Sequence, residues 1–297
     1  MTMNSGPEPK STNLTIVPKR RYGEWISAVI SAIAAVWILS SFVTAKIDYK
    51  LTFSYLFNNQ ILNGVVVTVW LTVGSMLIGI VLGVLVAVLR QSDNRVLSGL
   101  AGFYTWFFRG TPVLVQLLIW FNLALIFPVI SFPGLFSIQM TTVMTPFLAA
   151  LLALGINEGS YMSEIVRSGL IAVDDGQTEA AKALGMTTWV IMRKIVLPQS
   201  FRVILPPAGN EFIALLKTSA LAYVISVTEL LNSAFRIYSI NFRVIELLLT
   251  AAIWYLFLTT ILTLIQSRVE RRVNRGYGTQ SKPLRRLLVK NVFGVRR

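Results

Sequence analysis

The sequence predicts an all-α protein, a polytopic bundle of about six helices that cross a membrane. Of its 297 residues, 55% are hydrophobic and only 13% are charged, which is far from the composition of a soluble domain. Four uncharged runs reach or exceed the roughly 20 residues that cross a bilayer. These runs are residues 25–45, 51–89, 110–157 and 247–267. The absence of cysteine and histidine excludes disulfides, thiolate chemistry and imidazole metal sites.

Residues 25–45 form the first expected span. The basic cluster Lys19-Arg20-Arg21 precedes it, as basic residues precede the apolar core of a secretory signal. Its uncharged run of 21 residues is longer than the roughly 7–15 of a signal core, so we expect a retained anchor helix. Residues 1–50 are then a cytoplasmic N-terminus with an extra anchor. Cleavage after Val43-Thr44-Ala45 is the alternative.

The later spans follow from the remaining apolar runs. The second is expected at about 61–89. The run 110–157 is too long for one helix and contains the turn signal Ser131-Phe132-Pro133-Gly134, so we expect an external hairpin of two spans. The fifth and sixth are expected at about 203–230 and 246–267.

Basic residues between the spans set the expected orientation. One side has only Lys46, Lys50, Arg236 and Arg243. The other side collects Lys10, Lys19, Arg20, Arg21, Arg90, Arg95, Arg167, Lys182, Arg193, Lys194, Arg202 and the C-terminal tail. The positive-inside bias therefore predicts that both termini are cytoplasmic.

The net charge of +14 does not point to nucleic acid, because ten of the 27 basic residues lie between Arg268 and Arg297. A basic tail beside an apolar span is typical of a cytoplasmic topology signal that meets anionic lipid headgroups. We therefore expect residues 269–297 to be a basic cytoplasmic tail.

The polar segment 174–198 predicts two short helices joined by a sharp turn. Asp174 and Asp175 supply side-chain acceptors for a helix start, and residues 179–184 are mostly strong helix formers. Gly185 suits the left-handed position that closes a helix. A threonine pair then caps a second helix, which Pro198 follows where it should stop.

The same segment carries a spaced motif. Its fixed positions follow the pattern Glu-Ala-Ala-x3-Gly-x9-Ile-x-Leu-Pro, as Glu179, Ala180, Ala181, Gly185, Ile195, Leu197 and Pro198. The pattern resembles the EAA motif in membrane subunits of ATP-driven importers, where it transmits the work of ATP hydrolysis from a soluble subunit. An ordinary helix-turn-helix cytoplasmic loop is the alternative interpretation.

The resemblance extends over about 60–268 and narrows to one subfamily. The runs Phe108–Pro112 and Gly159–Arg167 are similar to signatures of permeases for polar amino acids, the histidine and glutamine uptake type. Two positions depart from that pattern, because Ala220 stands where serine is usual and Glu158 where a small or variable residue is expected. The first span and the basic tail lie outside the shared core of five helices.

The resemblance implies a type I ABC importer transmembrane domain at 51–268, working in a bacterial inner membrane. It implies as partners two ATP-binding cassette subunits, a second membrane subunit (the same or a homologous chain) and an external substrate-binding protein. The chain itself is then no enzyme and binds no cofactor, because ATP and magnesium belong to the ATPase subunit. Lys217-Thr218 is not preceded by glycine at the spacing of a Gly-x4-Gly-Lys-Ser/Thr phosphate loop. This agrees with the assignment of ATP binding to a separate subunit.

Gly110-Thr111-Pro112 is the expected centre of the substrate site. Threonine at the N-cap and proline at the first helical position predict a helix start. At membrane depth its free amides and positive dipole end suit the carboxylate of an amino acid. The alternative is a simple kink between an interfacial helix at about 97–108 and the span.

Ionisable and amide side chains inside spans usually face a cavity or one another. Gln116, Asn157, Glu158, Lys217 and Glu229 complete the expected substrate site. Glu158 or Glu229 would hold a positive group, unless Lys217 already pairs with one of them, so cationic or broadly polar amino acids are favoured. For Glu164 and Arg167, three residues apart on one helix face, a structural ion pair is the preferred interpretation.

Three other functions stay open at this point. An importer of the same class could carry another amine or an opine-like solute. A channel without ATP coupling, or a membrane scaffold, is a different class that has no use for the EAA segment. An intramembrane hydrolase is the weakest, because histidine, cysteine and a Gly-x-Ser-x-Gly elbow are all missing.

Overall fold

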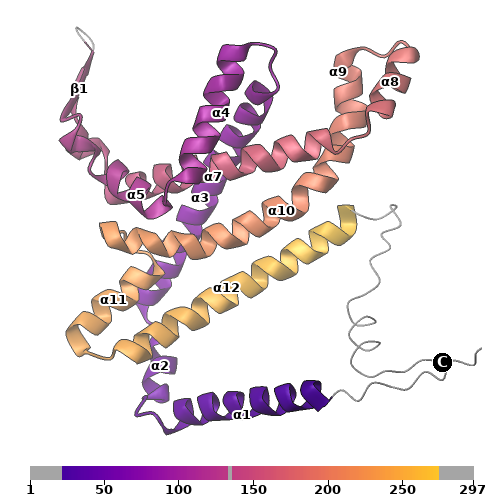
Figure 1. Ribbon diagram of the computed structural model, residues 1–297. Helices are drawn as coiled ribbons and strands as arrows, with labels where there is room; N and C mark the ends of the chain where they lie inside the picture. The colour runs from indigo at the N-terminus through magenta and orange to yellow at the C-terminus, as the bar shows by residue number, and fades with distance from the viewer. Residues whose placement is uncertain (1–21, 133–135, 274–297) are drawn as a thin grey trace, which may run out of the picture. The chain divides into compact units, whose positions relative to one another are not determined.

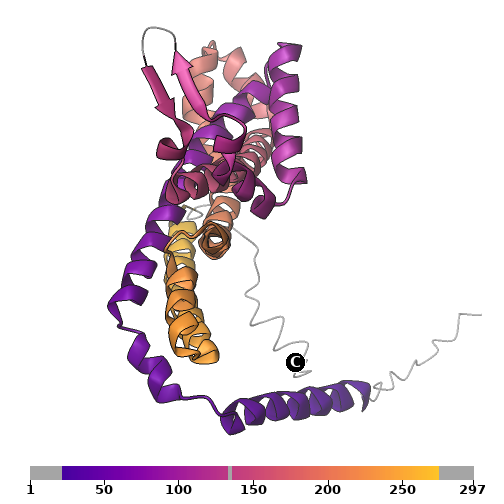
Figure 2. The same ribbon diagram turned by 90° about the vertical axis from the view of Figure 1, so that its left-hand side faces the viewer.

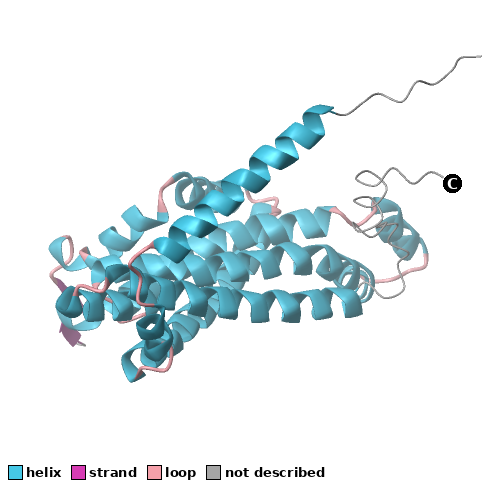
Figure 3. Ribbon diagram, turned by 90° about the horizontal axis from the view of Figure 1, so that it is seen from below, coloured by secondary structure: helices cyan, strands magenta, loops and turns pink. Residues whose placement is uncertain are grey.

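The computed structural model describes residues 22–132 and 136–273, and within these ranges only one short hairpin is not helical or loop (Figure 3). The described residues divide into two units, with the boundary between Asp48 and Tyr49. In the first unit, α1 (Tyr22–Thr44) is a single apolar helix of 23 residues without a buried side chain. It corresponds to the predicted anchor. Most of the predicted basic tail, from residue 274, lies outside the described residues.

Two long helices form the centre of the second unit. After the short α2 (Tyr49–Tyr55), α3 (Asn59–Arg90) packs along α7 (Pro146–Ile171) more extensively than any other pair of elements (Figure 1). The two helices approach closely because glycines lie at the contact. A β-carbon added at Gly83 would lie 2.5 Å from the β-carbon of Met162, so a larger residue there would push the helices apart.

A broken helix crosses beside this pair. α4 (Arg95–Gly110) ends at the predicted substrate motif, and α5 (Val113–Phe121) follows after a two-residue break. With its nine residues, α5 is about 14 Å long at 1.5 Å per residue, which is too short to cross a bilayer. α5 alone is therefore not the complete span that was expected in this part of 110–157.

The expected external turn is a β-hairpin. A short η1 (Leu123–Leu125) leads into β1 (Val129–Phe132), which pairs antiparallel with β2 (Phe136–Gln139), as the arrows in Figure 2 show. α6 (Met140–Val143) then leads to α7. The side chain of Thr145 caps the first turn of α7, because its hydroxyl oxygen accepts a hydrogen bond from the amide of Leu148. Alternating β-branched and aromatic residues beside a turn favour strands over helix ends.

The predicted helix pair at 174–198 is present. α8 (Asp175–Ala183) and α9 (Thr188–Ile191) are joined at Gly185, which has a φ of 75°. The prediction that the second helix stops before Pro198 is wrong. The chain continues as the π-helix η2 (Met192–Val196) into α10 (Leu197–Thr218), and Pro198 is the second residue of α10.

The last elements bring the chain back along α10. The 3-10 helix η3 (Ser219–Ile225) follows directly after α10. The helices α11 (Leu230–Asn241) and α12 (Val244–Val273) come next. Among the described helices, α1, α3 and α12 are long and apolar enough to span a membrane. The bent pair formed by 188–225 and 230–241 raises the number of candidate spans to four if the pair crosses as one span. α7 has 26 residues and is long enough, but it carries polar side chains into the bundle.

Candidate functional site

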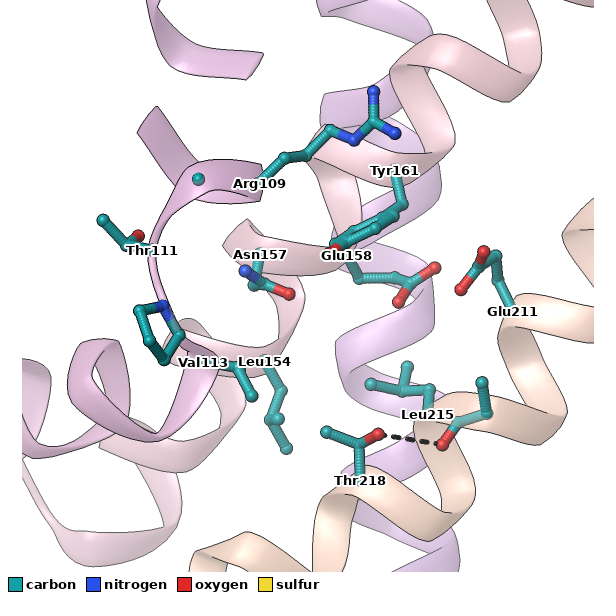
Figure 4. A pocket seen from close by; sticks show the side chains of 13 residues that line it. Arg109, Thr111, Val113, Leu154, Asn157, Glu158, Tyr161, Glu211, Leu215 and Thr218 are labelled. Carbon is teal, nitrogen blue, oxygen red and sulfur yellow. Dashed lines mark hydrogen bonds between the residues drawn. The ribbon is translucent and has the colours of Figure 1, made fainter. Parts of the chain in front are cut away.

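A cavity of about 530 Å³ lies where the α4–α5 break meets α7 and α10 (Figure 4). Five predicted site residues line it, namely Gly110, Thr111, Pro112, Asn157 and Glu158. The remaining lining residues, which the predicted site did not include, are Arg109, Val113, Leu154, Tyr161, Glu211, Ala214, Leu215 and Thr218. The structure therefore joins the predicted motif to two helices that are distant in sequence.

The break differs from the prediction by one residue. Thr111 does not cap α5, because its hydroxyl donates back to the Phe107 carbonyl of α4 at 2.8 Å. Pro112 stands at the N-cap position of α5, without a side-chain cap, and Val113 is the first helical residue. The start of α5 still presents uncapped backbone amides and a positive dipole end at the cavity.

Two amide side chains brace this break. Gln116 Nε2 lies within hydrogen-bond distance of the Phe108 carbonyl, at 3.0 Å, and of the carbonyl and hydroxyl oxygens of Thr111, at 3.1 and 2.7 Å. Asn157 Nδ2 donates to the same Phe108 carbonyl at 2.8 Å and contacts Gln116 Oε1 at 3.2 Å. Gln116 is buried and does not line the cavity, so the structure places it behind the break and not at the cavity surface. Its amide satisfies carbonyls that the helix end leaves open.

Two carboxylates face each other across the cavity. Glu158 is only 5% exposed, and its Oε1 has no hydrogen-bond partner among the described residues. Figure 4 shows its carboxylate pointing toward that of Glu211 on α10. Two like charges in a site of low dielectric constant repel each other, and a buried carboxylate without a partner is costly. A cation placed between them would relieve both costs.

A positive side chain also lines the cavity. The guanidinium carbon of Arg109 lies 5.3 Å from the centroid of the Tyr161 ring, a cation–π distance. Arg109 and Tyr161 line the cavity together with the start of α5. The cavity therefore holds groups suited to an anion, at Arg109 and the start of α5, and groups suited to a cation, at Glu158 and Glu211, which together match a zwitterion with an additional positive group.

Two residues of the predicted substrate site, Lys217 and Glu229, lie away from the cavity. Lys217 is exposed, does not line the cavity and forms no ion pair with Glu158 among the described residues. Glu229 is completely buried and caps α11, accepting from the amides of Leu231 and Asn232 and from the Tyr255 hydroxyl. Glu229 does not line the cavity, and its carboxylate is used by the fold, so the structure does not bring it to the predicted site.

The predicted ion pair at the other end of α7 is confirmed. Glu164 pairs with Arg167 at 2.6 Å, and Arg90 at the end of α3 joins it at 3.3 Å. Sequence reasoning missed Arg90, which is distant in the chain. The three charges tie the ends of α3 and α7 together.

The segment 174–198 is a compact, exposed protrusion. The side chain of Asp174 caps α8 as predicted, because its Oδ1 accepts a hydrogen bond from the Gly176 amide at 2.9 Å. The amides of Gly185 and Met186 donate to the carbonyls of Lys182 and Ala181, the paired bonds that end a helix at a left-handed residue. Ala181 is buried inside the turn, whereas Glu179 and Ala180 are exposed. The other predicted coupling residues, Ile195, Leu197 and Pro198, lie on η2 and the start of α10.

Residues 79–275 match the family model of the binding-protein-dependent transport system inner membrane component. The arginine transport system permease protein ArgU of Corynebacterium glutamicum is 40% identical over 282 residues, covering 92% of this chain and 88% of that protein. The nopaline transport system permease protein NocM of Agrobacterium fabrum is 39% identical, covering 69% and 83%. The glutamine transport system permease protein GlnP of Escherichia coli is 33% identical, covering 72% and 92%.

Solved structures agree with these sequence relatives. The chain is similar to the crystal structure of an amino acid ABC transporter with histidines, at a TM-score of 0.67 and 35% identity, covering 77% of this chain and 100% of that one. An inward-facing structure of the MetNI methionine ABC transporter has a TM-score of 0.57 at 21% identity, which shows the fold alone.

Proposed function

The chain belongs to the family of binding-protein-dependent transport system inner membrane components, and on that premise we propose that it is the permease subunit of an ATP-driven importer of polar amino acids, with cationic ones preferred. The predicted fold class, the helical membrane bundle of a type I ABC importer, is confirmed. A channel or scaffold without a binding protein is not compatible with the family.

The proposed preference for cationic cargo depends on Glu158. Its buried Oε1 without a partner, facing Glu211, needs a positive group, and the side chain of arginine or lysine would supply one. The carboxylate of the same molecule would meet Arg109 or the uncapped amides of α5. A cavity of about 530 Å³ lies within the roughly 300–1,000 Å³ typical of small-molecule sites.

The remaining parts of the assembly follow from the family. Two ATP-binding cassette subunits would dock on the 174–198 segments of two membrane subunits, and an external binding protein would deliver substrate. ATP binding would draw the segments together and turn the cavity outward. This arrangement requires the 174–198 segment and both termini to be cytoplasmic, and it leaves hydrolysis to the partner subunit.

The test uses the complete complex in lipid vesicles and measures substrate-stimulated ATP hydrolysis with arginine and with glutamine. Glu158→Gln keeps the size of the side chain and removes its charge. We expect stimulation by arginine to fall about tenfold, the factor for 1.4 kcal/mol, while stimulation by glutamine changes little. Equal losses for both, or no loss, would contradict the assignment of Glu158.

Opines are the second candidate cargo, because the nopaline permease is 39% identical to this chain. A thermal-shift panel of arginine, lysine, glutamine and nopaline on the purified complex separates the candidates. Stabilisation by nopaline alone would replace the amino-acid assignment.

A further inference from the structure

One uninterrupted helical rod joins the exposed 174–198 segment to the cavity. α9, η2 and α10 follow one another from Thr188 to Thr218 with right-handed helical backbone at every junction. Its first part belongs to the predicted docking segment, and Glu211 and Thr218 near its other end line the cavity. From residue 188 to residue 211 the rod is about 35 Å long. Movement at one end reaches the other only if the rod keeps its shape.

The weak point of the rod is Pro206-Pro207, which lies inside α10. Each proline lacks the amide hydrogen that would bond one turn back, and its ring crowds the carbonyl there, so the helix is free to bend at this point. The double proline lies between the docking end and Glu211. A change of bend here would absorb a displacement before it reached the cavity.

Gln266 on α12 reaches this point. Its Nε2 donates to the Pro206 carbonyl at 3.1 Å and lies 3.1 Å from Asn210 Oδ1 and 2.8 Å from Glu270 Oε1. Gly209 makes room for it, since a β-carbon at that position would lie 2.7 Å from Gln266 Cδ. One side chain therefore ties the double proline, at Pro206, and the turn that follows it, at Asn210, to the neighbouring helix α12.

An unfilled space lies beside the same contact. A mostly apolar hollow of about 160 Å³ lies between α10 and α12, with Phe212, Leu262 and Gln266 among the residues that line it. The hollow gives α10 room to change its bend if nothing holds the double proline.

We propose that Gln266 is a positioning residue for energy coupling: it braces the Pro206-Pro207 bend of α10, so that movement of the 174–198 segment is transmitted to the Glu211 side of the cavity. This inference rests on the proposed importer function. Gln266 touches neither the cavity nor the docking segment, and it acts only through the shape of α10.

The first experiment compares basal and substrate-stimulated ATP hydrolysis of the complete complex. In Gln266→Leu the side chain keeps its bulk and loses its donor. We expect basal hydrolysis to stay within about twofold, and stimulation by arginine with the binding protein to fall about fivefold, the factor that one hydrogen bond supports. Ser267→Ala is the matched control, because that hydroxyl bonds only within α12, to the Leu264 carbonyl.

A second measurement does not depend on the cargo. The chain has no cysteine, so spin labels can be placed at Leu184 and Tyr223, on either side of the bend. In the wild-type complex we expect the same label distance with and without ATP. In Gln266→Leu the distance should broaden or shift when ATP binds.

A pair of variants separates bracing from packing. Gly209→Ala should displace the Gln266 side chain and lower stimulation while the complex still assembles, and adding Gln266→Ala should lower stimulation no further. The inference is overturned if Gln266→Leu keeps normal stimulation and an unchanged label distance, or if basal and stimulated hydrolysis fall equally. A wild-type complex that arginine does not stimulate would overturn the proposed cargo, and the label distances would still decide the role of Gln266.

Discussion

Glu229 is an acid inside the bundle whose effect on stability can be worked out from its contacts. Its buried carboxylate accepts from the Leu231 amide at 2.8 Å, the Asn232 amide at 2.7 Å and the Tyr255 hydroxyl at 2.9 Å. Glu229→Ala leaves these three donors without an acceptor. Hydrogen bonds inside membrane bundles contribute about 0.6 kcal/mol on average and at most about 1.7, so the loss should be about 2–5 kcal/mol.

The assay is thermal unfolding of the detergent-purified complex. At roughly 2 °C per kcal/mol for a chain of this size, Glu229→Ala should lower the Tm by about 4–10 °C. Tyr255→Phe removes one donor and should lower it by about 1–3 °C. Neither variant should change the ratio of arginine-stimulated to glutamine-stimulated ATP hydrolysis, because neither side chain lines the cavity.

Two results would refute this account. A Tm of Glu229→Ala equal to that of the wild type would mean that the three bonds do not stabilise the start of α11. A changed arginine-to-glutamine ratio at normal stability would mean that Glu229 meets the substrate, as the sequence alone suggested. Glu229→Gln, which keeps one acceptor oxygen, should fall between the alanine variant and the wild type.

Three further predictions follow from other parts of the chain. Gly185→Pro should abolish uptake without preventing membrane insertion, because proline cannot adopt the φ of 75° and has no amide to donate to Lys182; normal uptake would remove the coupling assignment. Cysteines placed at Ser5 and Lys290 should both resist an impermeant label in intact cells, and labelling at Ser5 would overturn the orientation. Gly83→Val should lower the yield of folded protein several-fold in size-exclusion chromatography, and a normal yield would contradict the close packing of α3 and α7.

Local signals in the sequence were sufficient for the 174–198 segment. An aspartate cap, a run of helix formers and a glycine at the turn act within a few residues, so α8, α9 and the left-handed Gly185 could be predicted from the chain itself. The continuation through Pro198 could not, because a π-helix before a proline has no sequence signature that distinguishes it from a helix end.

The run 110–157 was harder because hydrophobic length does not distinguish elements. An apolar stretch of this kind fits two membrane helices, a buried strand pair or a broken helix equally well. Pro112 stops α4 from continuing, and the β-branched and aromatic residues around the external turn form strands. The break at Pro112 was predicted from the sequence, whereas the strands were not, because the count of residues needed to cross a bilayer outweighed their signal.

The polar residues inside the bundle show why the predicted site was only partly right. A polar side chain in a span was taken to face the substrate, yet each interruption of a helix also leaves backbone groups that need polar partners. Gln116 serves the break before α5, and Glu229 serves the start of α11. Glu158 is different, because it lies within an unbroken helix, is buried, and has an oxygen without a partner. A buried polar group that no helix break accounts for is therefore the better indicator of a substrate contact, and Glu158 meets that criterion.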